Sequence, residues 1–207
     1  MKKCILLLSV LLSAALSPVL AADDLRALTK KMADSRVTFS YSYETVRNGI
    51  VMEGGGTVAM QGEAYRMDGN GLEIVSDGTT RWTADAEAKE LFIETVDRSA
   101  GDFVSNPARL LANIDAAFTP ADAGESKFRG RVVQCYLLNP ANKGTGIREL
   151  RLYFADKTLV GAAFILKDGS EAEFVISDLV FAAPGPESDF RFDEKKTDGG
   201  WVITDLR

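Results

Sequence analysis

The eight residues from Val37 to Glu44, with the sequence VTFSYSYE, alternate apolar and polar side chains without exception. Successive side chains of an extended strand point to opposite faces, so this period of two is typical of an antiparallel sheet with one buried and one solvated face. The pattern therefore constrains the chain to a mainly β fold. Similar runs recur at 51–61, 64–67, 72–76, 79–83, 90–96, 131–138, 148–154, 159–166, 171–181 and 201–204.

Turn signals lie between several of these runs. Asn48-Gly49, Asp68-Gly69, Asp77-Gly78 and Asp168-Gly169 are dipeptides that favour two-residue type I′ hairpin turns. Ten or so short strands with tight hairpins predict a meandering antiparallel sheet that curls into a barrel or half-barrel. The length of 207 residues, without internal repeats or low-complexity tracts, fits a single domain after a targeting segment.

The N-terminus has the features of a secretion signal. Lys2 and Lys3 precede an apolar run over residues 4–16, and Val19-Leu20-Ala21 is a small-x-small cleavage site. Residues 1–21 are thus predicted to be a signal peptide, with residues 22–207 as the mature exported domain. Cys4 precedes the apolar run and so does not occupy the position of a lipidated cysteine; a soluble exported protein is expected.

A short amphipathic helix is predicted directly after the cleavage site. Asp23 or Asp24 can cap it, and Leu25, Leu28 and Met32 form one apolar stripe at spacings of three and four residues. Such a helix is expected to lie on a surface or across an opening.

A second short helix is predicted to interrupt the β pattern near the middle of the chain. Asn106 is an N-cap residue before Pro107 at the first helical position, which predicts a helix over about 107–114. Leu110, Leu111 and the following Phe118 supply apolar side chains for one face of this segment.

Charge and composition exclude several classes of function. The chain has 24 Lys and Arg against 30 Asp and Glu, a net charge of −6, which loss of Lys2 and Lys3 changes to −8. Such an acidic protein lacks the basic face that nucleic acid binding requires. The absence of histidine removes the usual Ser-His-Asp and Cys-His catalytic systems and all histidine metal ligands. Cys135, the single cysteine of the mature chain, lies in an apolar strand, where a structural thiol is expected.

The sequence presents no constellation typical of a catalytic, metal or cofactor site. Residues 68–73 resemble the start of a calcium loop, but Glu73 stands where that loop requires glycine, so a hairpin turn is the better interpretation. The acids at 122–125 are expected in a solvated loop. A carboxylate pair for glycoside hydrolysis stays open in a chain with 30 acids, although none stands out on a strand among sugar-stacking aromatic residues. We expect a protein that is not an enzyme and has no cofactor.

The strongest functional candidate is the apolar surface of the strands. Its large side chains either fill the core of a β-sandwich or line the cavity of a curved sheet, and periodicity alone does not separate these interpretations. The predicted lining residues, including an inward-facing Trp82, are Phe39, Tyr41, Tyr43, Val58, Met60, Tyr65, Met67, Trp82, Leu152, Phe154, Ile165, Phe174 and Ile176. The predicted helical lid residues are Leu25, Leu28, Met32, Leu110, Leu111 and Phe118.

The order and spacing of several short motifs resemble those of LolA, the periplasmic outer-membrane lipoprotein carrier family. The most specific motif is IVSDGTTRW at 74–82, which is similar to the family's hairpin of a hydrophobic residue, Ser-Asp-Gly and a later Trp. The resemblance covers nearly the whole mature chain. The other motifs that carry it are 39–46, 54–58, Tyr65-Arg66, 90–93, Asn106-Pro107, Phe190-x-Phe192 and 200–203.

This resemblance implies an incomplete antiparallel β-barrel, closed by a helical lid, around a hydrophobic cavity for the acyl chains of lipoproteins. It also implies a carrier that takes lipoproteins from an inner-membrane ABC-type release complex and passes them to an outer-membrane acceptor. The lining residues would then bind acyl chains. We expect a monomer with no nucleic acid partner.

One departure from the family concerns the lid. The best-studied branch has an arginine before an Arg-Pro turn that hydrogen-bonds the lid shut, whereas the equivalent stretch here is Met60-Gln61-Gly62-Glu63, and Arg66 is not expected to substitute. A divergent branch is therefore indicated. The alternatives on the same fold are a non-transporting lipid or lipoprotein sensor and an enzyme, which would need acids, Tyr or Lys clustered in the cavity.

Overall fold

Every strand in the described part of the chain belongs to one sheet. The computed structural model describes residues 18–47, 49–96, 114–144, 146–197 and 199–207. Within these ranges twelve strands pair in the order β12-β6-β5-β4-β3-β2-β1-β11-β10-β9-β8-β7. The strands are β1 (Arg36–Arg47), β2 (Ile50–Gln61), β3 (Ala64–Gly69), β4 (Leu72–Ser76), β5 (Thr80–Asp85), β6 (Glu90–Thr95), β7 (Phe118–Phe128), β8 (Arg131–Pro140), β9 (Ile147–Ala155), β10 (Thr158–Leu166), β11 (Glu171–Ala182) and β12 (Val202–Asp205).

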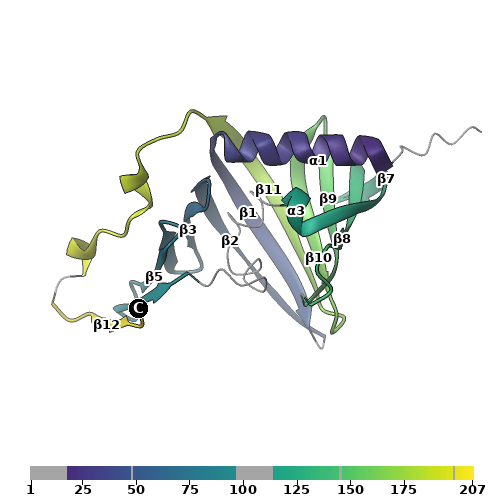
Figure 1. Cartoon of the computed structure of the whole chain (residues 1–207). Helices are drawn as coiled ribbons and strands as arrows, with labels where there is room; N and C mark the ends of the chain where they lie inside the picture. Colours follow the sequence, from purple (N-terminus) through teal and green to yellow (C-terminus); the bar gives the residue numbers. More distant parts are fainter. Residues whose placement is uncertain (1–17, 48, 97–113, 145, 198) are drawn as a thin grey trace, which may run out of the picture.

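The sheet is curved and open (Figure 1). Neighbouring strands are antiparallel except at one edge, where β12 runs parallel to β6. The edge strands β12 and β7 do not pair with each other, so the barrel is not closed. The predicted mainly β half-barrel is thus confirmed. A sandwich is excluded for the described strands, because all of them share one sheet.

Helix α1 (Pro18–Ala33) crosses one end of the concave side of the sheet (Figure 1). It begins at Pro18, a residue suited to the first helical turn, so the predicted caps Asp23 and Asp24 lie inside the helix and that prediction is wrong. Helix α3 (Ile114–Ala117) is a single turn that leads into β7. The helix predicted over about 107–114 lies outside the described residues except for Ile114, which is in α3. No helix in the described ranges has the length and apolar character needed to cross a membrane.

The hairpin turns differ from the type I′ turns that were predicted at the Asp-Gly pairs. Between β3 and β4 the turn is Asn70-Gly71, with φ of 53° and 81°, and Asp68-Gly69 stays within β3. At Asp77-Gly78 and Asp168-Gly169 only the glycine has positive φ, so neither pair forms the predicted type I′ turn, which requires two such residues.

Strand β7 was not predicted from the sequence. Its residues include Pro120 and Gly124, and the acids at 122–125 that were expected in a loop lie within it. Proline is tolerated on an edge strand, where one side makes no ladder hydrogen bonds, and the register shifts between Pro120 and Asp122. Edge position and this irregularity explain why the alternation is missing.

The convex face is covered at one end by the segment that follows β11, which contains the short 3-10 helices η1 (Glu187–Phe190) and η2 (Glu194–Lys196). Arg36 forms an ion pair with Asp189. The amide of Gly185 donates to Gln61 Oε1 at 2.8 Å, and Gln61 Nε2 donates back to the Gly185 carbonyl at 3.1 Å. The buried side chains of this convex cluster are Val75, Trp82, Ala84, Leu91, Ile93 and Phe192.

Candidate functional site

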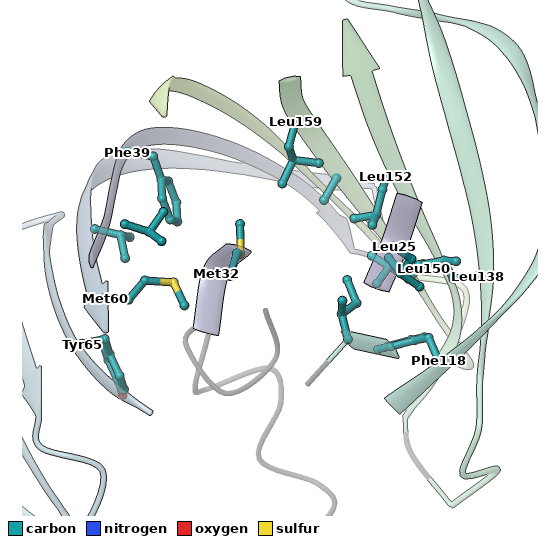
Figure 2. Close-up of a cluster of buried hydrophobic side chains, with 14 of the residues drawn as sticks. Leu25, Met32, Phe39, Met60, Tyr65, Phe118, Leu138, Leu150, Leu152 and Leu159 are labelled. Carbon is teal, nitrogen blue, oxygen red and sulfur yellow. The ribbon is translucent and has the colours of Figure 1, made fainter. Parts of the chain in front are cut away.

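The concave face carries the largest group of buried apolar side chains among the described residues, here called the concave cluster (Figure 2). Strands on both sides of the curve project side chains toward Leu25 and Met32 of α1. The buried members are Leu25, Met32, Val37, Phe39, Val58, Met60, Tyr65, Ile114, Phe118, Leu138, Ile147, Leu150, Leu152, Leu159 and Ala162.

The strand register explains why these residues meet. Phe39 lies opposite Val58, and Met60 lies opposite both Val37 and Tyr65. Cross-strand partners share one face of a sheet, and every second residue returns to that face, so the alternation seen in the sequence brings them together. Burying each large apolar side chain contributes about 1.5–3 kcal/mol, which makes the concave cluster the main stabilising unit of this half of the sheet.

Farther along the strands from α1, the concave face continues as a row of half-buried aromatic rings. This aromatic row consists of Tyr41, Tyr43, Phe174 and Phe164. The ring centroids lie 6.4 Å apart for Tyr41 and Tyr43, 5.9 Å for Tyr43 and Phe174, and 5.8 Å for Phe174 and Phe164. These are the separations of favourable aromatic pairs. Because the rings keep part of their surface exposed, they offer a ready-made apolar surface to a ligand.

Glycines in β2 make room for this row. Gly54 lies opposite Tyr43, and a Cβ at Gly54 would lie 2.8 Å from Tyr43 Cε1 and 2.6 Å from Asn70 Oδ1. Asn70 in turn donates from Nδ2 to the Tyr43 hydroxyl at 3.0 Å. Burial, and secondly the charge of Tyr43, raise the pKa of Tyr41, so its phenol stays neutral. The row is therefore an uncharged surface, and the hydrogen bond from Asn70 holds the ring of Tyr43 in place.

One polar side chain lies on the same face. Gln134 lies opposite Phe154 in the register, in phase with Tyr136 and Leu138 on the concave side. Its Nε2 atom is buried and has no hydrogen-bond partner in the part of the chain that the structure describes. An unsatisfied buried donor costs about 1–3 kcal/mol. The site therefore presents an unused N–H donor among apolar groups, suited to a carbonyl oxygen.

Most of the predicted lining residues lie on the concave face. The buried members of the concave cluster among them are Phe39, Val58, Met60, Tyr65 and Leu152. Those packed against it are Tyr41, Met67, Phe154 and Ile176, and those in the aromatic row are Tyr43 and Phe174. The described residues contain no group of three or more acidic or cysteine side chains arranged to hold a metal ion.

Two predicted lining residues lie on the opposite face, so their predicted placement is wrong. Trp82 lies opposite Val75 in the convex cluster, because the segment after β11 returns to cover that part of the sheet. Ile165 lies opposite Glu149, one position away from Phe164, which packs against the concave cluster. Neither side chain is part of the candidate site.

The predicted lid residues have mixed outcomes. Leu25 and Met32 of α1 are buried in the concave cluster, and Leu28 packs against it. Phe118 is also buried there, but as the first residue of β7 and not as part of a helix. Leu110 and Leu111 lie outside the described residues.

Sequence analysis did not select seven buried members of the concave cluster, which are Val37, Ile114, Leu138, Ile147, Leu150, Leu159 and Ala162. All but Ile114 lie in or at the edge of a predicted strand. Leu150, for example, is two positions before Leu152 and therefore on the same face. Extending the alternation from a selected residue along its own strand identifies such neighbours.

Sequence comparison identifies one family. The family model described as "Outer membrane lipoprotein carrier protein LolA" matches residues 65–193. This range contains β3 through β11, and so most of the strands that form the concave face. No curated protein matches the chain in sequence.

Several solved structures share similarity with this chain. An uncharacterized conserved protein from Thermus thermophilus is 12% identical, with a TM-score of 0.53 over 88% of this chain and 99% of that chain. A LolA superfamily protein from Nitrosomonas europaea is 12% identical, with a TM-score of 0.44 over 82% and 98%. A chain of the MucA/MucB complex from Pseudomonas aeruginosa is 18% identical, with a TM-score of 0.46 over 84% and 62%. The likeness to the Thermus protein shows a shared fold.

Proposed function

Because this chain belongs to the family of outer membrane lipoprotein carrier proteins, LolA, we propose that it is a periplasmic carrier for the acyl chains of lipoproteins. In this role it receives lipoproteins from an inner-membrane ABC-type release complex and passes them to an outer-membrane acceptor. The acyl chains bind on the concave face, and residues 1–21 act as the signal peptide that directs the chain to the periplasm.

The observation that carries this proposal is the kind of cover over the concave face. All twelve described strands lie in one sheet, so no second sheet within the described ranges packs on the concave cluster. Among the described elements, helices α1 and α3 cover the concave cluster (Figures 1 and 2). A single helix can be displaced from an apolar surface without breaking the hydrogen-bond ladder of the sheet. An acyl chain can therefore replace its contacts with equivalent ones.

The energies are suited to reversible binding. Burial of an acyl chain gains about 0.8 kcal/mol per methylene, so one long chain gains on the order of 10 kcal/mol before costs. Displacing α1 loses the burial of Leu25 and Met32, about 1.5–3 kcal/mol for each side chain. Ordering the cargo adds a further cost. The difference leaves binding tight enough for transport and weak enough for release.

Apolar contacts hold the lid in this branch of the family. Met60, in the stretch that corresponds to the lid-closing arginine, is fully buried in the same cluster as Met32 of α1 (Figure 2). Arg66 instead donates to the carbonyl oxygens of Asp189 at 3.1 Å and Arg191 at 3.2 Å. These contacts tie β3 to the C-terminal segment on the convex side. Cargo therefore competes with α1 for the same apolar surface.

Gln134 gives the site a polar anchor for the linkage end of the cargo. Lipid chains on a protein are attached through ester or amide carbonyls, which accept hydrogen bonds. Gln134 Nε2, which is buried and has no partner among the described residues, lies beside Phe154 on the face that would hold the chains. A carbonyl placed there would satisfy the donor while the hydrocarbon lies on the aromatic rings.

Native mass spectrometry of the mature protein, purified from its own periplasm, tests the proposed function. Co-purified acylated peptide supports a carrier of lipoproteins and begins to identify the cargo. Free lipid without acylated peptide would instead support a lipid-binding sensor. A protein that carries neither, and that also ignores an added fluorescent fatty acid, would overturn the proposal.

A matched pair of variants on β11 tests the location of the site. Phe174 belongs to the aromatic row, whereas Val180 is 54% exposed on the opposite face of the same strand. We expect Phe174→Asp to weaken binding of a fluorescent fatty acid by about tenfold or more, because a charge then lies in the acyl path. Val180→Asp serves as the control and is expected to bind normally. Equal binding by both variants would contradict the assignment of the concave face.

A further inference from the structure

The hairpin between β1 and β2 exposes an unusual concentration of apolar side chains at its end, here called the apolar tip. It consists of Val46, Ile50, Val51 and Met52, all among the exposed large hydrophobic residues of the described chain. Ile50 is the most exposed of the four, at 65%. The tip projects at the end of the sheet away from α1 (Figure 1). Scattered exposed apolar residues need no explanation, but a contiguous group indicates an interaction site.

The apolar tip is apolar on both faces of the sheet. Val46 lies opposite Val51, and the next pair toward the strand interior, Thr45 and Met52, points to the other face. Ile50 is in phase with Met52 and so belongs to the concave side, whereas Val46 and Val51 belong to the convex side. A partner protein that docks against one face of the hairpin would leave the other apolar pair in water. Burial of all four side chains requires a medium that surrounds the tip.

The tip is also continuous with the candidate acyl site. On the concave side of β2, the exposed Ile50 and Met52 are followed by Gly54 and Gly56, then by the buried Val58. The two glycines lie opposite Tyr43 and Tyr41 of the aromatic row. On β2 itself, this face leads from solvent to the concave cluster without a charged residue, and Arg47 of β1 is the register partner of Ile50.

The charges around the tip are mixed. Val46 lies opposite Glu171, so the β10–β11 loop adjoins the tip, and the Lys167 amide in that loop donates to the Gly146 carbonyl of the β8–β9 loop at 2.9 Å. Lys167 is followed directly by Asp168. The net charge of the whole chain is −6, which disfavours anionic headgroups. The chemistry of this end is therefore apolar insertion and not attraction to charged lipid.

We propose that the apolar tip inserts into the interface of a zwitterionic lipid bilayer and brings the open end of the concave face to the membrane. This inference rests on the proposed carrier function, for which it supplies the place where acyl chains enter or leave. Cargo chains would pass between bilayer and aromatic row along the concave side of β2. Membrane contact through side chains on both faces of one hairpin is shallow and reversible, as a shuttle requires.

Vesicle flotation with the mature protein and phosphatidylcholine liposomes tests this inference. We expect the wild type to float with the liposomes, and Ile50→Asp and Val51→Asp each to reduce the partition coefficient about tenfold or more, since each places a charge in the interface. The control is Val180→Asp on β11, because Val180 is 54% exposed, close to the 58% of Val51, and lies on the convex face outside the tip. Binding of a fluorescent fatty acid, measured on the same samples, is expected to be unchanged in Val51→Asp and in the control, because both residues lie on the convex face.

The outcomes separate this inference from the proposed function. A wild type that binds the fatty acid but not liposomes overturns the membrane inference and leaves the carrier proposal standing. A wild type that binds no fatty acid overturns the carrier proposal, whatever the flotation result. Loss of liposome binding in only one tip variant would indicate contact through one face of the hairpin and overturn insertion. Loss in Val180→Asp as well would show nonspecific adhesion and overturn it too.

Discussion

Two buried nitrogen atoms, Trp82 Nε1 and Gln134 Nε2, have no hydrogen-bond partner within the described residues. They differ in surroundings. Trp82 lies in the convex cluster, where its ring fills a core beneath the C-terminal segment and its size outweighs one lost hydrogen bond. Gln134 lies on the concave face next to Phe154, where a purely structural role would be met better by leucine. At the residue scale, Gln134 is thus the clearest sign of a ligand.

The variant Gln134→Leu tests that assignment. Removing the unsatisfied donor is expected to raise the free energy of unfolding by about 1 kcal/mol, measured by urea denaturation. The same variant is expected to bind an ester-linked acyl ligand several-fold more weakly than the wild type, while a plain hydrocarbon probe binds equally to both. A less stable variant would show that the amide has a structural partner.

The β9–β10 hairpin contains a second residue-scale feature. Its turn residues Asp156 and Lys157 both have positive φ, 49° and 64°, although neither is glycine. Left-handed backbone costs a non-glycine residue about 1–2 kcal/mol. A glycine removes this cost, but its greater flexibility in the unfolded chain cancels part of the gain. We therefore expect Lys157→Gly to raise the free energy of unfolding by about 0.5–1 kcal/mol. Gly71→Ala, in the Asn70-Gly71 turn, should change stability in the opposite direction; a neutral result for both would contradict the strain argument.

At the scale of elements, α1 is the part of the fold most suited to movement. It contributes Leu25 and Met32 to the concave cluster, while Arg26 on its outer side forms only an exposed contact with Asp23. The helix is amphipathic, so its attachment depends on a few apolar side chains and not on ladder hydrogen bonds. A weak attachment of this kind lets a cover exchange with cargo.

Met32→Ala tests α1 as an exchangeable cover. We expect the free energy of unfolding to fall by about 2–5 kcal/mol, because a fully buried methionine is truncated. The association rate of a fluorescent fatty acid in stopped-flow measurements is expected to rise, since less apolar contact must be displaced. Arg26→Ala provides the control and should change neither quantity. A slower association rate in Met32→Ala would indicate that Met32 binds the ligand directly.

The strands were largely predictable because each has its own local pattern, as in 72–76 and 171–181, which match β4 and β11 closely. Strand β7 lacks such a pattern, since Pro120 and the register shift lie in it and β8 is its one partner among the described strands. The start of α1 was also missed. Caps are weak local signals, and Pro18 extends the helix beyond the aspartates.

At the scale of the whole molecule, the sequence predicts which residues share a face of the sheet, but not which face becomes concave. Alternation shows that Phe39 and Val58 share a side, but it does not show which side of β4 and β5 becomes concave. That depends on the segment after β11, which lies far along the sequence from β5 and returns to bury Trp82 on the convex side. The sequence near Trp82 contains no signal of a covering segment that lies so far along the chain, so the predicted placement of Trp82 was wrong.

Charge is the other property of the whole molecule that bears on function. The chain has no histidine, so no imidazole titrates near neutral pH. The pKa of Tyr41 is raised, first by burial and then by Tyr43. The neutral phenol therefore contributes its full stability to the fold below about pH 10, and this stability is lost only as pH rises through the folded pKa.

We expect the dissociation constant of a fluorescent fatty acid to vary less than about twofold between about pH 6 and pH 7.5. A change of about tenfold across this range would show that a charged group controls the site.

The unpaired edges β12 and β7 have a mechanical consequence. In a closed barrel, strand number and stagger set the diameter, so the interior has one size. An open sheet has no such geometric lock, so its radius of curvature can change as the strands bend. In the proposed carrier, the concave side would therefore adjust to the bulk of its cargo, and the same residues would hold chains of different length and number.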